Sequence, residues 1–178
     1  MTKLIVLDRD GVINKDSISY IKSVDEFILI PESVEAIVQL SQAGYTVAVA
    51  TNQSGVSRGL YTEDALQAIH QKMTAAILSA GGRIDVIEHC IHLPESHCLC
   101  RKPEPGMLHA IAKRFNCSLQ GVPFVGDRVS DIQAALAVDA QAVLVLSSMT
   151  DVKALQAYPE VPVYSSLANY VKTLFSAS

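Results

Sequence analysis

Short runs of continuous apolar residues alternate with amphipathic segments along most of the chain, and this alternation restricts the fold more than any other feature. Continuous apolar runs are typical of strands buried on both faces, and amphipathic helices cover those faces. We therefore predict one α/β domain over residues 1–178, a three-layer, Rossmann-like sandwich with a parallel central sheet. We expect strands at 3–8, 45–52, 84–90, 122–127 and 142–146, and helices at 32–43, 62–81, 106–115, 130–138 and 166–175.

The composition excludes several classes of protein. Hydrophobic residues make up 49% and charged residues 18% of the 178, which is typical of a globular and not of a disordered chain. A net charge of -4 gives no reason to expect nucleic acid or an anionic membrane as a partner. No apolar run approaches the roughly 18 residues of a membrane span. The first residues lack the apolar stretch and cleavage site of a signal peptide, so we expect none. We expect a cytoplasmic monomer.

Acidic residues follow directly after two of the predicted strands. LIVL at 4–7 leads into Asp8 and Asp10, and VPFVG at 122–126 leads into Asp127, with Asp131 four residues later. The carboxyl ends of parallel strands meet at one edge of a sheet, where ligands bind. Carboxylates this close raise one another's pKa unless a cation neutralises them. The four acids favour Mg²⁺, which suits a few carboxylates with waters and phosphate oxygens.

Neutral donors and a lysine are expected at the same edge. The strand that ends in ATNQSG supplies the hydroxyl of Thr51, the amides of Asn52 and Gln53, and the hydroxyl of Ser54. Lys102, in CRKPEPG, is a compact cation that suits a phosphate group. Carboxylates with Mg²⁺, donors and a lysine together indicate a phosphoryl-transfer site.

The segments LDRDG, TNQSG, RKPEPG and VGDRVSD, in this order, resemble the motifs of the haloacid dehalogenase (HAD) superfamily, over about residues 3–146. The resemblance implies that Asp8 is the nucleophile that becomes an aspartyl-phosphate. It implies that Asp10 protonates the leaving alcohol and then activates water for hydrolysis of this intermediate. Thr51 and Lys102 would hold the phosphoryl oxygens.

The same resemblance implies the ligands of the cation. Mg²⁺ would be bound by the carboxylates of Asp8 and Asp127 and by the backbone carbonyl of Asp10, with Asp131 supporting through water or Lys102. Larger members of the superfamily insert a cap domain after the first or second motif. About 40 residues separate Asp8 from the second motif, which leaves little room, so we expect no cap domain.

Cysteines and a histidine cluster in the polar segment CIHLPESHCLC, residues 90–100. The spacing C-x-H-x5-C-x-C supplies three thiolates and one imidazole, the ligands of a closed structural Zn²⁺ site. The expected ligands are Cys90, His92, Cys98 and Cys100. His89 and His97 are rival imidazoles, and His92 is preferred because the family pattern places its histidine two residues after the first cysteine. Cys117 lies outside this segment and is expected to be a small buried hydrophobe.

The cysteine segment followed by CRKP resembles the branch of the superfamily that contains the heptose bisphosphate phosphatases and the histidinol-phosphate phosphatases. INKDSISYIKSVDEF and TNQSGVSRGLYT look most like the heptose branch, whose product feeds lipopolysaccharide precursors, and the histidinol-phosphate branch stays the alternative. A small doubly phosphorylated sugar is the expected partner. Its binding residues would be Asp16, Tyr20, Thr51, Asn52, Gln53, Ser54, Arg101, Lys102 and Arg128. Where the family often has a Thr-Gly turn after the last strand, this chain has LSSMTD.

A phosphoacceptor signalling domain is a more distant alternative. Such domains also combine strand-end aspartates, a threonine and a lysine with Mg²⁺. Two acids two residues apart and the cysteine segment before Lys102 argue against it. Release of phosphate over many turnovers distinguishes the two, because a switch would retain its phosphate.

Overall fold

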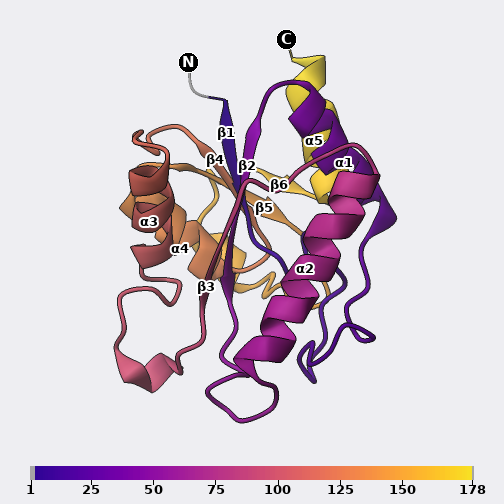
Figure 1. Ribbon diagram of the computed structural model, residues 1–178. Coiled ribbons are helices and arrows are strands. Elements are labelled where there is room, and N and C mark those ends of the chain that lie inside the picture. Colours follow the sequence, from indigo (N-terminus) through magenta and orange to yellow (C-terminus); the bar gives the residue numbers. More distant parts are fainter. Residues whose placement is uncertain (1–2, 178) are drawn as a thin grey trace.

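The computed structural model describes residues 3–177, which form a six-stranded parallel sheet with five α-helices packed on its two faces (Figure 1). The strands are β1 (Leu4–Leu7), β2 (Thr46–Asn52), β3 (Val86–Cys90), β4 (Pro123–Gly126), β5 (Gln141–Val145) and β6 (Val163–Tyr164). The helices are α1 (Pro31–Gln42), α2 (Glu63–Ser79), α3 (Gly106–Arg114), α4 (Val129–Ala137) and α5 (Leu167–Ser176). The predicted α/β fold with a parallel sheet is confirmed.

The strand order is β3-β2-β1-β4-β5-β6, and every pairing is parallel. The order therefore reverses between β1 and β4, and open α/β sheets bind ligands beyond the carboxyl ends of the strands at such a point. Leu7 of β1 lies opposite Val125 of β4, and the N–H of Asp8 donates to the carbonyl of Val125 (2.9 Å). Asp8 and Asp127 consequently leave the sheet side by side.

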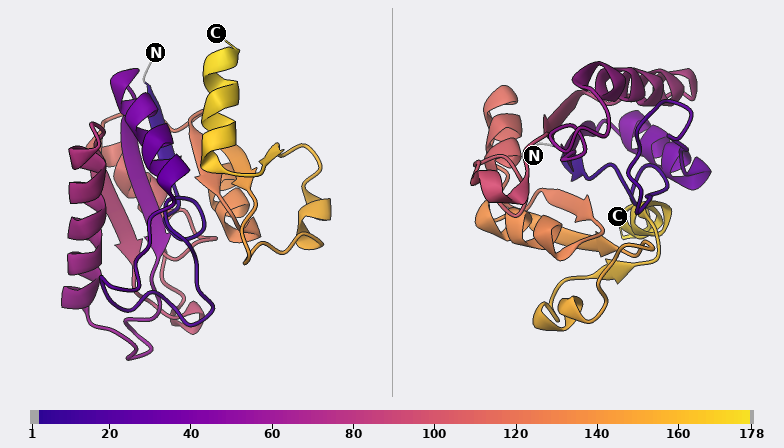
Figure 2. Two further views of the ribbon diagram at one scale, coloured as in Figure 1. Left: turned by 90° about the vertical axis from the view of Figure 1, so that its right-hand side faces the viewer. Right: turned by 90° about the horizontal axis from the view of Figure 1, so that it is seen from below.

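The continuous apolar character of the strands is explained by burial on both faces. Ile5 and Leu7 of β1 belong to a core cluster with α1, α2 and α5, whereas Leu4 and Val6 belong to a second cluster with α3 and α4. Figure 2 shows the sheet between these two helix layers. None of the helices within residues 3–177 has the length and apolar character needed to cross a membrane.

The element boundaries differ from the predicted ones by a few residues. Thr62 caps α2, as its sequence position indicates, by accepting a hydrogen bond from the N–H of Ala65 (3.0 Å). The strand predicted from residue 84 begins at Val86, because the side chain of Asp85 accepts from the N–H of Val47 (2.8 Å). The two-residue strand β6 was missed, because two residues are too few to show a periodic pattern.

Three loops surround the carboxyl edge of the sheet, at the bottom of Figure 1. Residues 8–30 follow β1, residues 53–62 follow β2, and residues 91–105 follow β3. The first loop is folded back on itself by isolated bridges that pair Asn14 with both Asp10 and Leu29. Within residues 3–177 no cap domain is inserted in these loops, and they wall the space at this edge together with the start of α4 and the segment after β5.

Candidate active site

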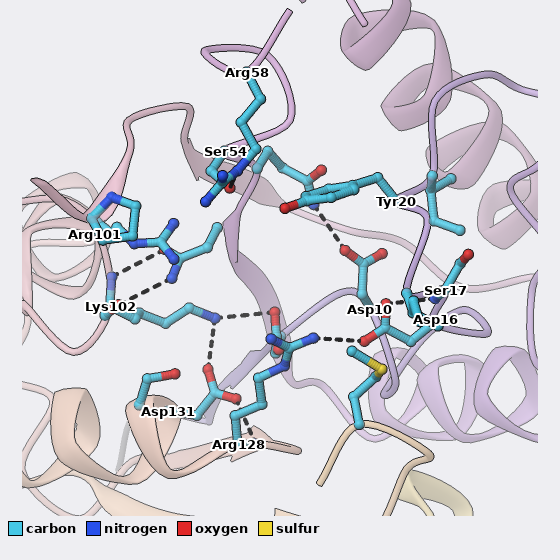
Figure 3. Close-up of a pocket in the computed structure, with 18 of the residues that line it drawn as sticks. Asp10, Asp16, Ser17, Tyr20, Ser54, Arg58, Arg101, Lys102, Arg128 and Asp131 are labelled. Carbon is cyan, nitrogen blue, oxygen red and sulfur yellow. Dashed lines mark hydrogen bonds and ion pairs between the residues drawn. The ribbon is translucent and has the colours of Figure 1, made fainter. Parts of the chain in front are cut away.

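A cavity of about 540 Å³ opens at the carboxyl edge of the sheet, above β1, β2 and β4 (Figure 3). Its lining brings together most of the predicted site residues: Asp8, Asp10, Asp16, Tyr20, Asn52, Gln53, Ser54, Arg101, Lys102, Arg128 and Asp131. Thr51 and Asp127 are buried and do not line it. The strand ends named by the sequence therefore do converge on one space.

The carboxylates of Asp8, Asp127 and Asp131, here called the carboxylate centre, have oxygens within 4.8 Å of one another. Burial and the charge of Asp131 raise the pKa of Asp8 well above its ordinary value, although Lys102 acts in the opposite direction. Burial and Asp131 also raise the pKa of Asp127, to about 6. Oδ1 of Asp127 is buried without a hydrogen-bond partner in the described chain. Clustered carboxylates and an unpartnered oxygen fit a hard cation such as Mg²⁺.

Lys102 pairs with two of the three carboxylates of this centre, Asp8 and Asp131. Lys102 Nζ lies 2.7 Å from Asp131 Oδ1, 3.0 Å from Asp8 Oδ1 and 2.9 Å from the carbonyl oxygen of Ala50. Burial disfavours the lysine charge, but Asp131 and Asp8 outweigh it and raise the pKa of Lys102. Oδ2 of Asp131 accepts from the N–H groups of Asp127 and Arg128 (both 3.1 Å). Both oxygens of Asp131 are thus engaged, which suits the supporting role predicted for it.

Two glycines allow the acids to approach the backbone this closely. A Cβ at Gly126 would overlap the side chain of Asp131, and a Cβ at Gly11 would overlap Oδ2 of Asp127. Gly11 also has φ +85°, a conformation that glycine adopts without strain. The glycines after β1 and at the end of β4 are therefore part of how the centre is built.

Asp10 is held by neighbours on both of its oxygens. Oδ1 accepts from Nε (2.9 Å) and Nη2 (2.7 Å) of Arg9 and from Nδ2 of Asn14 (2.9 Å), and Oδ2 accepts from Nε2 of Gln53 (3.1 Å). Burial acts to raise the pKa of Asp10, but the Arg9 charge and these hydrogen bonds lower it overall. Sequence reasoning missed Arg9 and Asn14, although both lie in the LDRDGVIN segment that supplied the two acids.

Thr51 and Gln53 belong to one hydrogen-bond network beside Asp10. Gln53 Nε2 donates to the Thr51 hydroxyl (2.8 Å) as well as to Asp10, and Gln53 Oε1 accepts from the hydroxyl of Tyr61 (2.6 Å). Burial raises the pKa of Tyr61 to about 12, so its hydroxyl stays a donor. Asn52 instead binds the backbone of Lys102, accepting from its N–H (3.0 Å) and donating to its carbonyl (3.1 Å). Asn52 thereby fixes the lysine at the second strand end.

Arginine side chains lie on several sides of the cavity, with Arg128 beside Asp131 and Arg58 on the opposite side (Figure 3). Arg128 Nη2 pairs with Asp16 Oδ2 (3.1 Å), which joins the N-terminus of α4 to the loop after β1. Arg58 lies over the ring of Tyr20, 6.0 Å from its centroid, and its Nε donates to Ser54 Oγ (3.2 Å). Arg58 was missed, although the segment SGVSRG placed it directly after the second motif.

The segment LSSMTD after β5 supports Asp127. The hydroxyl of Ser147 donates to Asp127 Oδ2 (2.6 Å), and the hydroxyl of Thr150 donates to the backbone carbonyl of Asp127 (2.7 Å). The sequence marked this segment only as a departure from the family pattern. Its contact with Asp127 depends on the pairing of β5 with β4, which no local pattern reveals.

The predicted cysteine loop, residues 90–100, brings its four expected ligands together. Cys90 Sγ lies 3.7 Å from Cys98 Sγ and 3.4 Å from His92 Nδ1, and His92 Nδ1 lies 3.2 Å from Cys100 Sγ. Cys98 and Cys100 are 3.7 Å apart, while Cys90 and Cys100 are closer, at 2.8 Å. A tetrahedral zinc centre separates its ligand atoms by roughly 3.5–3.8 Å. The donor set therefore fits Zn²⁺, and two of the five separations match a tetrahedral centre, whereas the other three are shorter.

The fourth cysteine, Cys117, and the residues that follow the loop are compatible with a zinc site formed by the other three cysteines and His92. Cys117, predicted to be buried, is partly exposed; it packs against the core cluster under α3 and α4 and does not belong to the group of four ligands. The loop runs directly into Arg101 and Lys102, and Arg101 Nη1 donates to the carbonyl of His92 (3.4 Å). A metal that fixes the loop would therefore also fix the two cations that follow it.

Several known proteins are similar to this chain over most of its length. The family model described as HAD-hydrolase-like matches residues 99–173. A D-glycero-beta-D-manno-heptose-1,7-bisphosphate 7-phosphatase of Pseudomonas putida is 49% identical over 173 residues, which cover 97% of this chain and 99% of that protein. The protein of the same name from Bordetella bronchiseptica is 53% identical over 133 residues, covering 75% of this chain and 74% of its own. A crystal structure of a D,D-heptose 1,7-bisphosphate phosphatase from B. bronchiseptica, complexed with magnesium and phosphate, has a TM-score of 0.92 and 44% identity, and covers 99% of this chain and 100% of its own.

Proposed function

The chain belongs to the heptose-1,7-bisphosphate 7-phosphatase family of HAD-like hydrolases, and from this premise we propose that it removes the C7 phosphate of D-glycero-β-D-manno-heptose 1,7-bisphosphate. The observation that carries the proposal is the convergence of Asp8, Asp127 and Lys102 beside Asp10 at the floor of one cavity. The β anomer is proposed because the names of the relatives specify it.

Asp8 is the nucleophile in this proposal. Its carboxylate reaches the cavity, and Lys102, 3.0 Å away, supplies a positive charge for the phosphoryl oxygens. Asp8, Asp127 and the backbone carbonyl of Asp10 would hold Mg²⁺, whose charge would neutralise the phosphate and favour the ionised form of Asp8. Attack by Asp8 on phosphorus forms the aspartyl-phosphate and splits a difficult hydrolysis into two easier steps.

Asp10 carries the proton in this proposal. It gives a proton to the departing sugar oxygen, and it then takes one from the water that attacks the aspartyl-phosphate. In the absence of substrate the pKa of Asp10 is lowered, which favours the carboxylate. In this proposal the negative charge of the arriving substrate favours the protonated form that acts as the acid. Thr51 and Gln53 support the same region through their shared hydrogen bond.

The second phosphate of the substrate would bind the arginines that line the cavity. We place the sugar among Asp16, Tyr20, Asn52, Gln53 and Ser54, and the C1 phosphate near Arg101 and Arg128. Arginine suits this position because its planar fork binds phosphate oxygens in pairs. A cavity of about 540 Å³ is large enough for a seven-carbon bisphosphate.

Phosphate release from the two anomers of heptose 1,7-bisphosphate and from histidinol phosphate tests the proposal. We expect many turnovers in the presence of Mg²⁺ and the highest kcat/KM for the β anomer. Asp10→Asn should abolish turnover without changing circular dichroism or zinc content. Preference for histidinol phosphate would overturn the substrate, and a single turnover with retained phosphate would favour a signalling domain.

We further propose that Zn²⁺ in the cysteine loop is structural, because its three sulfurs and one nitrogen leave no ligand position for substrate. The single-domain organisation over 1–178, the monomeric state and the cytoplasmic location stay predictions. Analytical ultracentrifugation at several protein concentrations measures the oligomeric state.

A further inference from the structure

Arg9 is a completely buried cation to which the proposed chemistry assigns no role. It stands between the two acids of the first motif, has 0% exposure, and is among the largest fully buried side chains of the described chain. Taking such a charge out of water costs several kcal/mol unless it is well paired. Its position inside the catalytic motif therefore calls for a physical explanation.

Every part of the guanidinium has a partner. Nε and Nη2 both donate to Oδ1 of Asp10, Nη1 lies 3.1 Å from Nε2 of His70, and the group lies over the ring of Phe27, 5.5 Å from its centroid. His70 comes from the buried face of α2. Burial, then Arg9 and His89, lower the pKa of His70 to about 3 although Asp10 acts in the opposite direction, so the ring is neutral and Nε2 can accept. Helix α2 thus contributes, through His70, a hydrogen-bond acceptor that orients the Arg9 guanidinium.

The consequence falls on the two oxygens of Asp10, which become unequal. Oδ1 accepts three hydrogen bonds, two from Arg9 and one from Asn14, and has little capacity left for a further partner. Oδ2 receives Gln53 alone among the described residues, and the Asp10 side chain is 21% exposed toward the cavity. Figure 3 shows the Asp10 carboxylate reaching into this space beside Tyr20.

We propose that Arg9 is a positioning residue that, together with His70, anchors Oδ1 of Asp10 so that Oδ2 alone exchanges protons with the substrate. The inference rests on the proposed function. In the first step the proton on Oδ2 moves to the sugar oxygen as its bond to phosphorus breaks and the Asp8–phosphorus bond forms. In the second step Oδ2 takes a proton from water as the water oxygen bonds to phosphorus and Asp8 is released.

A leaving-group comparison tests this role. The sugar oxygen needs a proton to depart, whereas the nitrophenolate of p-nitrophenyl phosphate departs without one. General acid catalysis contributes about 10²–10⁴-fold. In Arg9→Met we expect kcat/KM for the heptose bisphosphate to fall about 100-fold, and kcat/KM for p-nitrophenyl phosphate to fall less than about tenfold. Arg9→Lys keeps the charge but loses the fork, and should show the same selectivity with a smaller loss.

Two further variants separate positioning from general destabilisation. Arg83→Met removes an arginine whose partners, Asp85 and the Tyr45 carbonyl, lie away from the cavity, and it should leave both kcat/KM values unchanged. His70→Leu removes only the partner of Nη1, so it should reproduce the selective loss in weaker form even if Arg9→Met does not fold, whereas His70→Gln, which keeps an acceptor, should retain activity. Equal losses on both substrates in Arg9→Lys and His70→Leu would overturn the inference. A wild-type protein inactive on every phosphate ester would instead overturn the proposed function.

Discussion

The carboxylate centre and the cysteine loop are both clusters of metal-ligand atoms, but they are built in opposite ways. The centre takes Asp8 from the end of β1 and Asp127 and Asp131 from the end of β4 and the start of α4, and all three are buried. The cysteine loop takes all its ligands from eleven consecutive residues, and Cys98 and Cys100 are partly exposed. One cluster depends on the sheet, and the other on the spacing within a single segment.

This difference indicates whether a metal at each cluster would contribute to catalysis or to the stability of the fold. The sheet positions the carboxylates without a bound ion. Because the carboxylates are buried close together, the pKa values of Asp8 and Asp127 are raised. Beyond Cys90, which ends β3 and is buried, the cysteine loop contains only a three-residue 3-10 turn, Pro94–Ser96, none of whose residues is buried. Its order would come from the ligands, so zinc there would serve structure, whereas magnesium at the centre would serve the proposed chemistry.

The largest effect is expected from Asp8→Asn, which removes the nucleophile from the centre. Phosphate release should fall by at least about 10⁴-fold, because no aspartyl-phosphate can form. Zinc content, measured by atomic emission, and circular dichroism should match the wild type. Loss of zinc in this variant would mean that the two clusters are coupled, and the comparison would fail.

Breaking the cysteine loop should act on stability first. Cys98→Ser should reduce zinc from about one ion per chain to a small fraction and lower the free energy of unfolding by roughly 3–5 kcal/mol. Activity should fall as well, because Arg101 and Lys102 follow directly from the loop. Cys117→Ser, outside the ligand set, is the control and should keep both zinc and stability. Unchanged stability in Cys98→Ser would contradict a structural role for the metal.

Ser147→Ala should act on the centre alone. Its hydroxyl orients Asp127, and loss of such a hydrogen bond behind a metal ligand weakens metal binding about 10–100-fold. Calorimetric titration with Mg²⁺ measures this directly, and saturating Mg²⁺ should restore most of the activity. Ser148→Ala, at the exposed neighbouring position, should bind Mg²⁺ like the wild type. Equal affinity in the two variants would remove Ser147 from the support of Asp127.

The last prediction concerns His70, whose effect is absent at neutral pH and grows only as the pH falls. Its pKa in the folded chain is about 3, below the ordinary 6.5, so the unfolded chain binds the extra proton. Its contribution to stability is therefore complete above about pH 6.5 and is lost as the pH falls toward 3, by about 1.4 kcal/mol per pH unit. Chemical denaturation between pH 7 and pH 4 should show a shallower slope in His70→Gln than in the exposed control His109→Gln. Identical slopes would show that the imidazole is not held neutral.

Local patterns in the sequence predicted much of the fold and site. The apolar runs identified β1 to β5, and the spacing within residues 90–100 identified the ligand cluster, because both depend on neighbours along the chain. The motifs also located Asp8, Asp10, Lys102 and Asp127. They missed Arg9, Asn14 and Arg58, which lie within or directly after the motifs, because the motif pattern assigns these positions no contact. They missed His70 because its contact with Arg9 depends on the packing of α2.

By itself the sequence determined which residue types end each strand, and hence that acids, donors and a lysine would collect at one edge of a parallel sheet. Only the tertiary structure decided which of them touch. The placement of β4 beside β1 joins Asp8 to Asp127, the pairing of β5 with β4 brings Ser147 to Asp127, and the packing of α2 sets His70 against Arg9. The physical reason is that strand order and helix packing are set by burial of the whole core, and no single segment encodes them.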